Sequence, residues 1–229
     1  MRRHLLVLVL CGSAGCAHFA AAGPGSGGDG SGGIPVTNGN AGALQPLEES
    51  RAPFPSAAGE PHPEGINTTT GSNADFAFAF GSGYVHAPLT DVLAALRQPE
   101  VVLDHRRVDE WQLDRGLDQL ATGFRIHNVV HGIITVDFDT TWVQAVTSGT
   151  AAAPKTACIR ATTKSNTRFI HLIEDSIVGK AIDAQTTALE FVRHLNGFMV
   201  GPKDAEQWVK DIFANVVAKV HGRPVPKYK

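Results

Sequence analysis

Cysteine is scarce in this chain of 229 residues, which contains only three. Cys11 and Cys16 lie in an N-terminal segment with the pattern of a signal peptide, so Cys158 has no partner for an internal disulfide. Charge is also low: Asp, Glu, Lys and Arg make up 18% of the residues, and the formal net charge is -2. That balance argues against a nucleic-acid partner, because nucleic-acid binding requires a basic surface.

The sequence also lacks short motifs that mark common catalytic and nucleotide sites. It contains no GxSxG nucleophile motif and no P-loop. Cys158 shares a strand face with Arg160 but has no activating neighbour in the sequence, so we interpret it as a buried, inert thiol. We expect no cofactor.

Apolar runs long enough to span a bilayer are absent as well. The run at residues 5–10 follows two arginines, which is typical of a signal peptide. The small residues 13–15 then lead to Cys16 and resemble a bacterial lipoprotein box, which implies acylation at Cys16. The alternative is an ordinary secretory signal that is cleaved near residues 20–22.

Composition divides the chain into three parts. We expect a lipoprotein-type signal peptide at residues 1–16, a disordered linker rich in Gly, Pro and Ser at residues 17–73, and a folded domain at residues 74–229. A lipid on Cys16 would attach the protein to a membrane as an outer-membrane lipoprotein of the cell envelope. Without that lipid, we expect a periplasmic or secreted protein. We expect a monomer in either case.

The last long segment, residues 201–222, predicts an amphipathic α-helix. Pro202 suits the first turn, and Gly222 can adopt the left-handed conformation that ends a helix. The apolar residues recur with helical spacing and form one broad stripe: Ala205, Trp208, Val209, Ile212, Phe213, Val216, Val217 and Val220.

Residues 124–142 alternate between apolar and polar side chains on either side of Gly132, which predicts a β-hairpin. With a loop at residues 131–133, Ile126 would face Phe138 on an apolar surface. His127 would then face Asp137 on a charged surface.

Two pairs of polar residues in this hairpin suggest chemistry. His127 and His131 would lie about 13 Å apart on a strand, too far to share a metal ion, so we expect no metal site. Asp137 and Asp139 would lie about 7 Å apart on one face, a separation compatible with acid–base work on a glycoside. We favour a solvated face, because Arg125 and His127 are expected opposite them.

The order of elements is a strand, two short helices, further antiparallel strands and the long helix. The stretches GSGYVHAPLTDVLAALRQPE, FRIHNVVHGIITVDFDTTW and FIHLIEDSIVGKAI, with the final helix, resemble the helix-grip fold of the START and polyketide-cyclase-like (SRPBCC) superfamily. The resemblance implies an α+β fold, in which a curved antiparallel sheet of about six to seven strands wraps around the C-terminal helix. Two short helices would follow the first strand.

The same resemblance implies a cavity between the sheet and the helix. Glu174 and Asp175 interrupt an apolar strand, so one of them must point inward, where Arg193 or His194 could meet it. We expect the cavity residues to include Ile126, Asn128, Phe138, Trp142, Glu174, Arg193, Trp208, Ile212 and Phe213, although any single apolar one is more simply interpreted as core and the cavity itself rests on the resemblance.

Three functions remain open. We favour noncatalytic binding of a lipid-like or other apolar small molecule. An enzyme of the polyketide cyclase or hydrolase type, using Glu174, Asp175, Arg193 or His194, is the first alternative. A structural envelope lipoprotein, packed solid and without a ligand, is the second.

Overall fold

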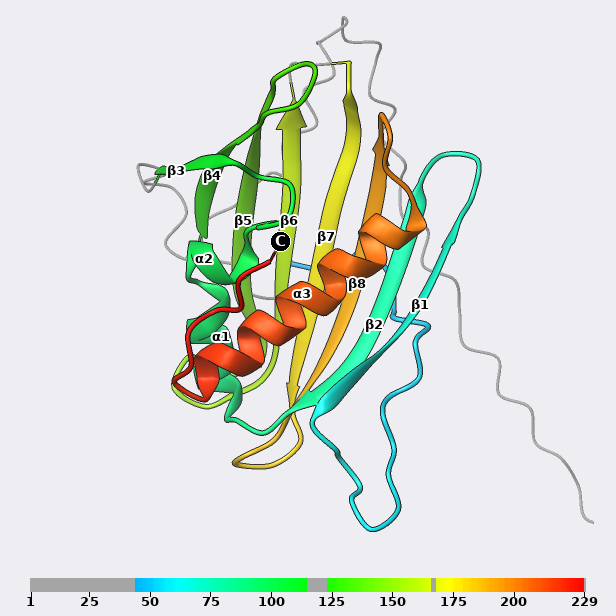
Figure 1. Cartoon of the computed structure of the whole chain (residues 1–229). Coiled ribbons are helices and arrows are strands. Elements are labelled where there is room, and N and C mark those ends of the chain that lie inside the picture. Colours follow the sequence, from blue (N-terminus) through cyan, green and yellow to red (C-terminus); the bar gives the residue numbers. More distant parts are fainter. Residues whose placement is uncertain (1–43, 115–122, 166–167, 229) are drawn as a thin grey trace, which may run out of the picture. The chain divides into compact units, whose positions relative to one another are not determined.

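One eight-stranded antiparallel sheet forms the framework of the protein, with the strand order β1-β2-β8-β7-β6-β5-β4-β3 (Figure 1). The structure is a computed structural model that describes residues 44–114, 123–165 and 168–228. The strands are β1 (Gly65–Ser72), β2 (Ala77–Val85), β3 (Glu110–Asp114), β4 (Gly123–Val130), β5 (Val136–Gly149), β6 (Pro154–Ser165), β7 (Ile170–Ala181) and β8 (Thr187–Gly197). Cys16 and the predicted signal peptide lie outside the described residues.

Three helices accompany the sheet. Two short ones, α1 (Leu89–Leu96) and α2 (Pro99–Val102), lie between β2 and β3, and the long helix α3 (Pro202–Val220) follows β8. Helix α3 runs across one face of the curved sheet (Figure 1). This is the helix-grip arrangement that the sequence predicted, with eight strands in place of six to seven and with the short helices after the second strand.

Helix α3 forms as its apolar stripe predicts. Its buried residues include Trp208, Val209, Ile212 and Phe213, all on the side that faces the sheet. The Asp204 carboxylate accepts a hydrogen bond of 2.7 Å from the Gly201 backbone N–H, which closes the first turn. Gly222 ends the helix with a φ of +67°.

Two glycines in β2 allow α3 to lie close to the sheet. A Cβ on Gly81 would lie 2.6 Å from Val209 Cγ1 of the helix. A Cβ on Gly83 would lie 2.9 Å from Phe213 Cε2 and 2.4 Å from a backbone oxygen of β1, that of Gly65. Side chains at these positions would push the helix and β1 outward, because real Cβ contacts are longer.

The folded part begins earlier than the predicted residue 74. Gly65–Ser72 form the edge strand β1, paired with β2 along its whole length. Residues 44–54 cross the outer face of the sheet, where the His194 ring lies 2.9 Å from Glu48 Oε1. A small second apolar cluster forms there from Leu47, Ala52, Phe78, Phe80 and Val192. This region could not be recognised as folded from the sequence, because the region contains few apolar residues.

The β4–β5 hairpin has the predicted faces but a different register. Ile126 lies opposite Thr140, two residues beyond the predicted partner Phe138. The cause is the loop, which covers residues 131–135 in place of 131–133. A shift of two residues keeps every side chain on its face, because strand side chains alternate with a period of two.

Candidate ligand cavity

A cavity of about 650 Å³ lies between the inner face of the sheet, the first half of α3 and the segment after α2. Its walls come mainly from alternate residues of β4, β5, β7 and β8, which point toward the helix. The apolar lining side chains include Val108, Ile126, Val130, Val136, Phe138, Trp142, Ile173, Leu195 and Trp208. The wall is therefore largely apolar and large enough for a small molecule.

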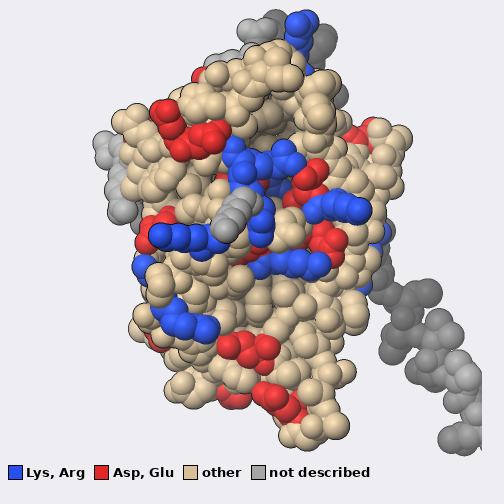
Figure 2. Space-filling model, viewed as in Figure 1, with Lys and Arg blue, Asp and Glu red and all other residues tan. Residues whose placement is uncertain are grey.

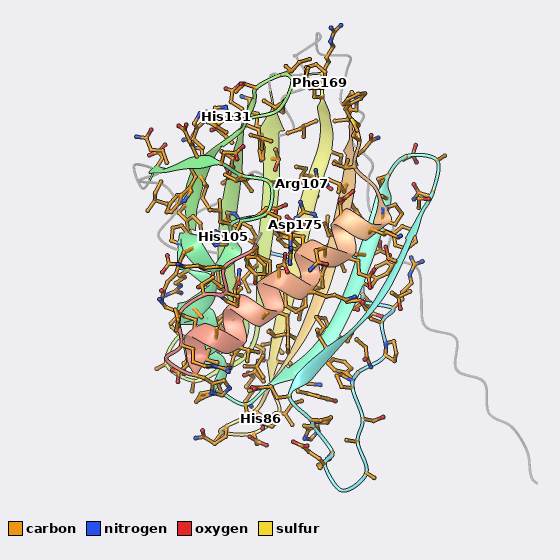
Figure 3. The ribbon with its side chains drawn as sticks, in the orientation of Figure 1. His86, His105, Arg107, His131, Phe169 and Asp175 are labelled. Atoms are coloured by element: carbon orange, nitrogen blue, oxygen red, sulfur yellow. The ribbon has the colours of Figure 1, made fainter. Side chains whose placement is uncertain are left out.

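A buried ion pair forms the polar part of this wall. Arg193 Nη1 on β8 lies 3.2 Å from Asp175 Oδ1 on β7, and the two side chains are only 7% and 2% exposed. The guanidinium also stacks on Trp208, with its carbon 4.1 Å from the ring centroid. In Figure 3, Asp175 lies close to α3, well below the end of the sheet where Phe169 and His131 are labelled.

Burial determines the electrostatics of this pair. It raises the pKa of Asp175 from 3.8 to about 7, although the charge of Arg193 acts in the opposite direction. The Nε–H of Arg193 is buried and has no hydrogen-bond partner among the described residues. A buried donor without an acceptor is costly, so an additional oxygen near this pair would be favourable.

Asn128 is a second polar group in the wall, on β4. Its amide nitrogen lies within hydrogen-bond distance of the Ile126 and Phe138 carbonyls and of Thr140 Oγ1, at 3.1, 3.3 and 3.3 Å. Within the described part of the chain its amide oxygen accepts no hydrogen bond. Asn128 can therefore accept one hydrogen bond from a guest molecule.

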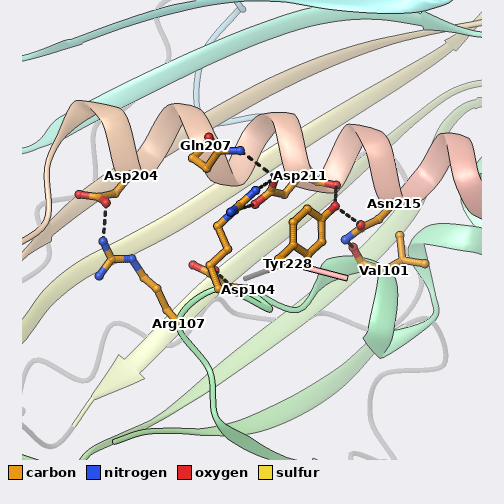
Figure 4. A network of polar contacts seen from close by, with 9 residues as sticks. Val101, Asp104, Arg107, Asp204, Gln207, Asp211, Asn215 and Tyr228 are labelled. Carbon is orange, nitrogen blue, oxygen red and sulfur yellow. Dashed lines mark hydrogen bonds and ion pairs between the residues drawn. The ribbon is translucent and has the colours of Figure 1, made fainter. Parts of the chain in front are cut away.

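A strap, residues 103–109, connects α2 to β3 and closes one side of the cavity. Arg106 Nε lies 2.5 Å from Asp211 Oδ2 on α3, and Arg107 pairs with Asp204 of the same helix (Figure 4). Tyr228 of the C-terminal tail stacks on the Arg106 guanidinium, 4.7 Å from its ring centroid. A smaller, polar pocket of about 250 Å³ lies between the strap and α3.

The mouth of the cavity has a rim of four exposed apolar side chains. Ile133 and Ile134 belong to the β4–β5 loop, and Phe198 and Met199 to the loop between β8 and α3. Arg107, which Figure 3 labels between this end and Asp175, lies on the strap side of the cavity.

Six of the nine residues predicted for the cavity line it: Ile126, Asn128, Phe138, Trp142, Arg193 and Trp208. Ile212 and Phe213 do not, since they pack in the core where α3 lies against β2 and β8. Glu174 is not part of the lining either. The inward carboxylate is Asp175, which pairs with Arg193 in the strand register. From the sequence, Asp175 was only one of two candidates, with Glu174, for the carboxylate that points inward.

The residues considered for an enzyme are divided between the two faces of the sheet. Asp175 and Arg193 line the cavity, whereas His194 pairs with Glu48 and stacks on Phe76 on the outer face. No more than two of the four groups therefore meet in one concave site. This arrangement does not provide the four-residue constellation that the first alternative considered.

Other candidate chemistry is distributed over the surface or buried. His127 lies 2.9 Å from Asp139 rather than meeting Asp137, and both side chains are more than a third exposed. Among the residues that the structure describes, no group of three His, Cys, Asp or Glu side chains is arranged to hold a metal ion. Cys158 is buried in β6, and burial raises the pKa of its thiol to about 11. None of the described helices is long and apolar enough to cross a membrane.

Comparisons with known proteins concern the fold. No family model and no curated protein sequence matches this chain. The human StarD13 (DLC2) lipid transfer and protein localization domain is 11% identical, with a TM-score of 0.46 over 70% of this chain and 85% of that one. A STAR-related lipid transfer protein from Xanthomonas axonopodis is 13% identical, with a TM-score of 0.47 over 70% and 93%. The Zhui aromatase/cyclase from Streptomyces sp. R1128 is 10% identical, with a TM-score of 0.38 over 69% and 93%. These scores are below 0.5, so the functional interpretation depends on the cavity of this chain.

Proposed function

We propose that this protein binds one apolar small molecule with a single neutral polar end, without chemically altering it. The observation that supports this is the combination of a largely apolar cavity of about 650 Å³ with one buried ion pair in its wall. Cavities of this size bury most of the surface of a lipid-like or drug-sized guest. The cavity also counts against a domain that is packed solid.

The ion pair indicates which polar end the guest carries. A hydroxyl group can accept a hydrogen bond from Arg193 and donate one to Asp175, so it satisfies both partners. Above the Asp175 pKa of about 7, a carboxylate would meet the negative charge of Asp175 at short range in a region that excludes water, which is unfavourable. We therefore propose a long-chain or polycyclic alcohol rather than a fatty acid.

Tryptophan fluorescence can test this proposal, since two of the three tryptophans line the cavity. Trp111 is 42% exposed on β3 and outside the cavity, so Trp111→Phe leaves only Trp142 and Trp208 as reporters. At pH 8, where Asp175 is ionised, we expect a brominated long-chain alcohol to quench this variant at lower concentration than the matching brominated fatty acid. Absence of quenching by either compound would refute the proposal.

Two substitutions in the same hairpin, on opposite faces of the sheet, provide a matched control. Val136→Phe places a larger side chain in the cavity wall and should weaken quenching by the alcohol. Val129 on β4 points to the opposite face of the sheet, so Val129→Phe should bind the alcohol as the parent does. Asp175→Asn should remove the preference for the alcohol over the acid, because it removes the negative charge that repels a carboxylate. Equal binding of the alcohol by Val136→Phe and Val129→Phe would contradict the assigned cavity.

An enzyme remains a second candidate because the cavity wall contains a carboxyl group, Asp175, beside the guanidinium of Arg193. The pKa of Asp175 near 7 suits a general acid or base at neutral pH. Asp175→Asn should leave guest binding nearly intact under either hypothesis. Conversion of a guest by the parent protein, detected by mass spectrometry and abolished in this variant, would establish catalysis and replace binding as the function.

We also propose that the protein is exported and attached to the cell envelope through acylated Cys16. The support is the pattern of residues 1–16, with an apolar run followed by small residues and a cysteine. Mass spectrometry of the mature N-terminus decides between the alternatives: an acylated Cys16 supports the anchor, and an unmodified end near residues 20–22 refutes it.

A further inference from the structure

Exposed apolar side chains are concentrated at the mouth of the cavity. Among the described residues, six large apolar side chains are exposed, and four of them form the rim. The exposed fractions are 107% for Ile133, 54% for Ile134, 67% for Phe198 and 81% for Met199. Single exposed apolar residues are ordinary, but a cluster around one opening indicates an interaction surface.

The antiparallel topology brings the two rim loops together. The loop after β4 and the loop after β8 lie at the same end of the sheet, at the top of Figure 1, and Figure 3 shows Phe169, just before β7, at that end. The Phe198 backbone N–H donates a hydrogen bond of 2.8 Å to the Phe169 carbonyl, and the two rings lie 6.1 Å apart edge to face. The loop after β8 is thus fixed to the start of β7 at this end of the sheet.

The backbone of the second rim loop has an uncommon conformation. Met199 has a φ of +58° and is the single residue other than glycine with a positive φ in the described ranges. Gly197 precedes it at a position where a Cβ would lie 2.8 Å from the Phe169 carbonyl oxygen. This turn places Phe198 and Met199 in water, although burial would be the usual fate of such side chains.

We propose that this rim inserts into the surface of a lipid bilayer, so that the cavity opens directly into the membrane. The proposal rests on the proposed function in one respect: if the cavity holds an apolar guest, a rim inserted in the bilayer lets that guest leave the cavity without crossing water. A lipid bilayer can accommodate side chains that protrude from two separate loops, because insertion into a bilayer does not require a partner surface of complementary shape. In Figure 2 the centre of the top is uncharged, acidic side chains lie to its left, one basic side chain lies at the uppermost point, and most of the visible Lys and Arg lie lower, across the middle.

Charge and chain length agree with this partner. Arg168, next to Phe169, and Lys203, just after the second rim loop, are exposed cations that can reach lipid phosphates. Only 27 residues, 17–43, separate Cys16 from the described domain. A chain of that length spans at most about 95 Å, so an acylated Cys16 would keep the rim within reach of the same membrane.

Vesicle binding tests the proposal separately from guest binding. The full chain with Cys16→Ser, which cannot be acylated, is floated with phosphatidylcholine vesicles at low and high salt. We expect binding that persists at high salt, because the interaction is apolar. The double variant Phe198→Ser, Met199→Ser should lower the partition coefficient roughly a hundredfold, since one large apolar side chain contributes about a factor of ten or more.

Ile182→Ser is the matched control, because Ile182 is exposed at the opposite end of the sheet and should not affect binding. Failure of the Cys16→Ser chain to float, or equal floating of the double variant, would overturn the proposal. Self-association that the double variant abolishes, without vesicle binding, would assign the rim to a protein interface instead. Quenching by the brominated alcohol without floating would refute the rim proposal alone, and floating without quenching would refute the proposed function alone.

Discussion

Asp175→Asn should make the protein increasingly more stable than the parent as the pH rises from about 4 to about 7. The folded protein holds a proton on Asp175 up to a pKa of about 7, whereas the ordinary value is 3.8. Between these values the folded state binds more protons than the unfolded chain, so the contribution of this group to stability falls as the pH rises. Below about pH 4 the carboxyl is neutral in both states, and the contribution is fully present.

The size of this effect follows from the pKa difference. One pH unit corresponds to about 1.4 kcal/mol, so a difference of about three units costs the parent roughly 4 kcal/mol by pH 7. Asparagine resembles the neutral acid and does not titrate, so the variant avoids this loss. Arg193→Met should act in the opposite direction, because it removes the charge that lowers the pKa of Asp175 and so extends the loss to higher pH.

Urea unfolding followed by tryptophan fluorescence, repeated between about pH 4 and pH 8, measures the free energy of unfolding of each variant. The parent and Asp175→Asn should agree at the acidic limit and diverge above it. The reasoning is refuted if Asp175→Asn is less stable than the parent at pH 8. That result would mean that attraction to Arg193 outweighs the cost of burying the carboxylate, as in pairs whose disruption destabilises the fold by about 3–5 kcal/mol.

Two further predictions concern packing and the buried thiol. Gly83→Ala should lower the free energy of unfolding by about 1–3 kcal/mol, because its Cβ would lie 2.4 Å from the Gly65 carbonyl oxygen. Gly65→Ala is the control in the same urea experiment and should have little effect, because no atom lies within 4 Å of its Cβ. Equal stability of the two variants would contradict the close approach of β1 and β2 at Gly83. Burial raises the pKa of the Cys158 thiol to about 11 in the folded protein, so the thiol should react slowly with a maleimide. In a variant whose other two cysteines are replaced by serine, the reaction should be far slower in the folded protein than in urea. Equal rates would contradict the burial of Cys158.

The periodic parts of the fold could be predicted from the sequence. The stripe on α3 repeats with helical spacing, and its end at Gly222 follows from glycine's access to positive φ. The two faces of the β4–β5 hairpin follow from alternation. The register of that hairpin could not be predicted, because a shift of two residues leaves the same side chains on each face.

The edge strand β1 was not predictable for a different reason. No residue of Gly65–Ser72 is fully buried, half of them are exposed, and Ile66 is the apolar residue that packs against the core. Such a strand has no alternation of apolar and polar side chains to reveal it. Its position is determined by hydrogen bonds to β2, which any sequence of suitable shape can form.

The cavity could be predicted only in part. Trp208, Ile212 and Phe213 share one stripe of α3, but only Trp208 reaches the cavity. Val209 and Phe213 lie against Gly81 and Gly83 of β2, whereas Trp208 faces the cavity, and this arrangement depends on residues distant in the sequence. Sequence periodicity identifies which residues point inward, but not whether neighbouring atoms fill the space in front of them.

The apolar cluster on the outer face has a practical consequence for anyone who shortens this chain. A version that begins at residue 74, where the composition changes, would lose the β1 edge and uncover Phe80 and Val192, which are 1% and 2% exposed in the intact fold. The newly bare edge of β2 would then be free to pair with a second molecule, and we expect aggregates. Recombinant versions should therefore start before Leu47, even though the preceding composition looks dispensable.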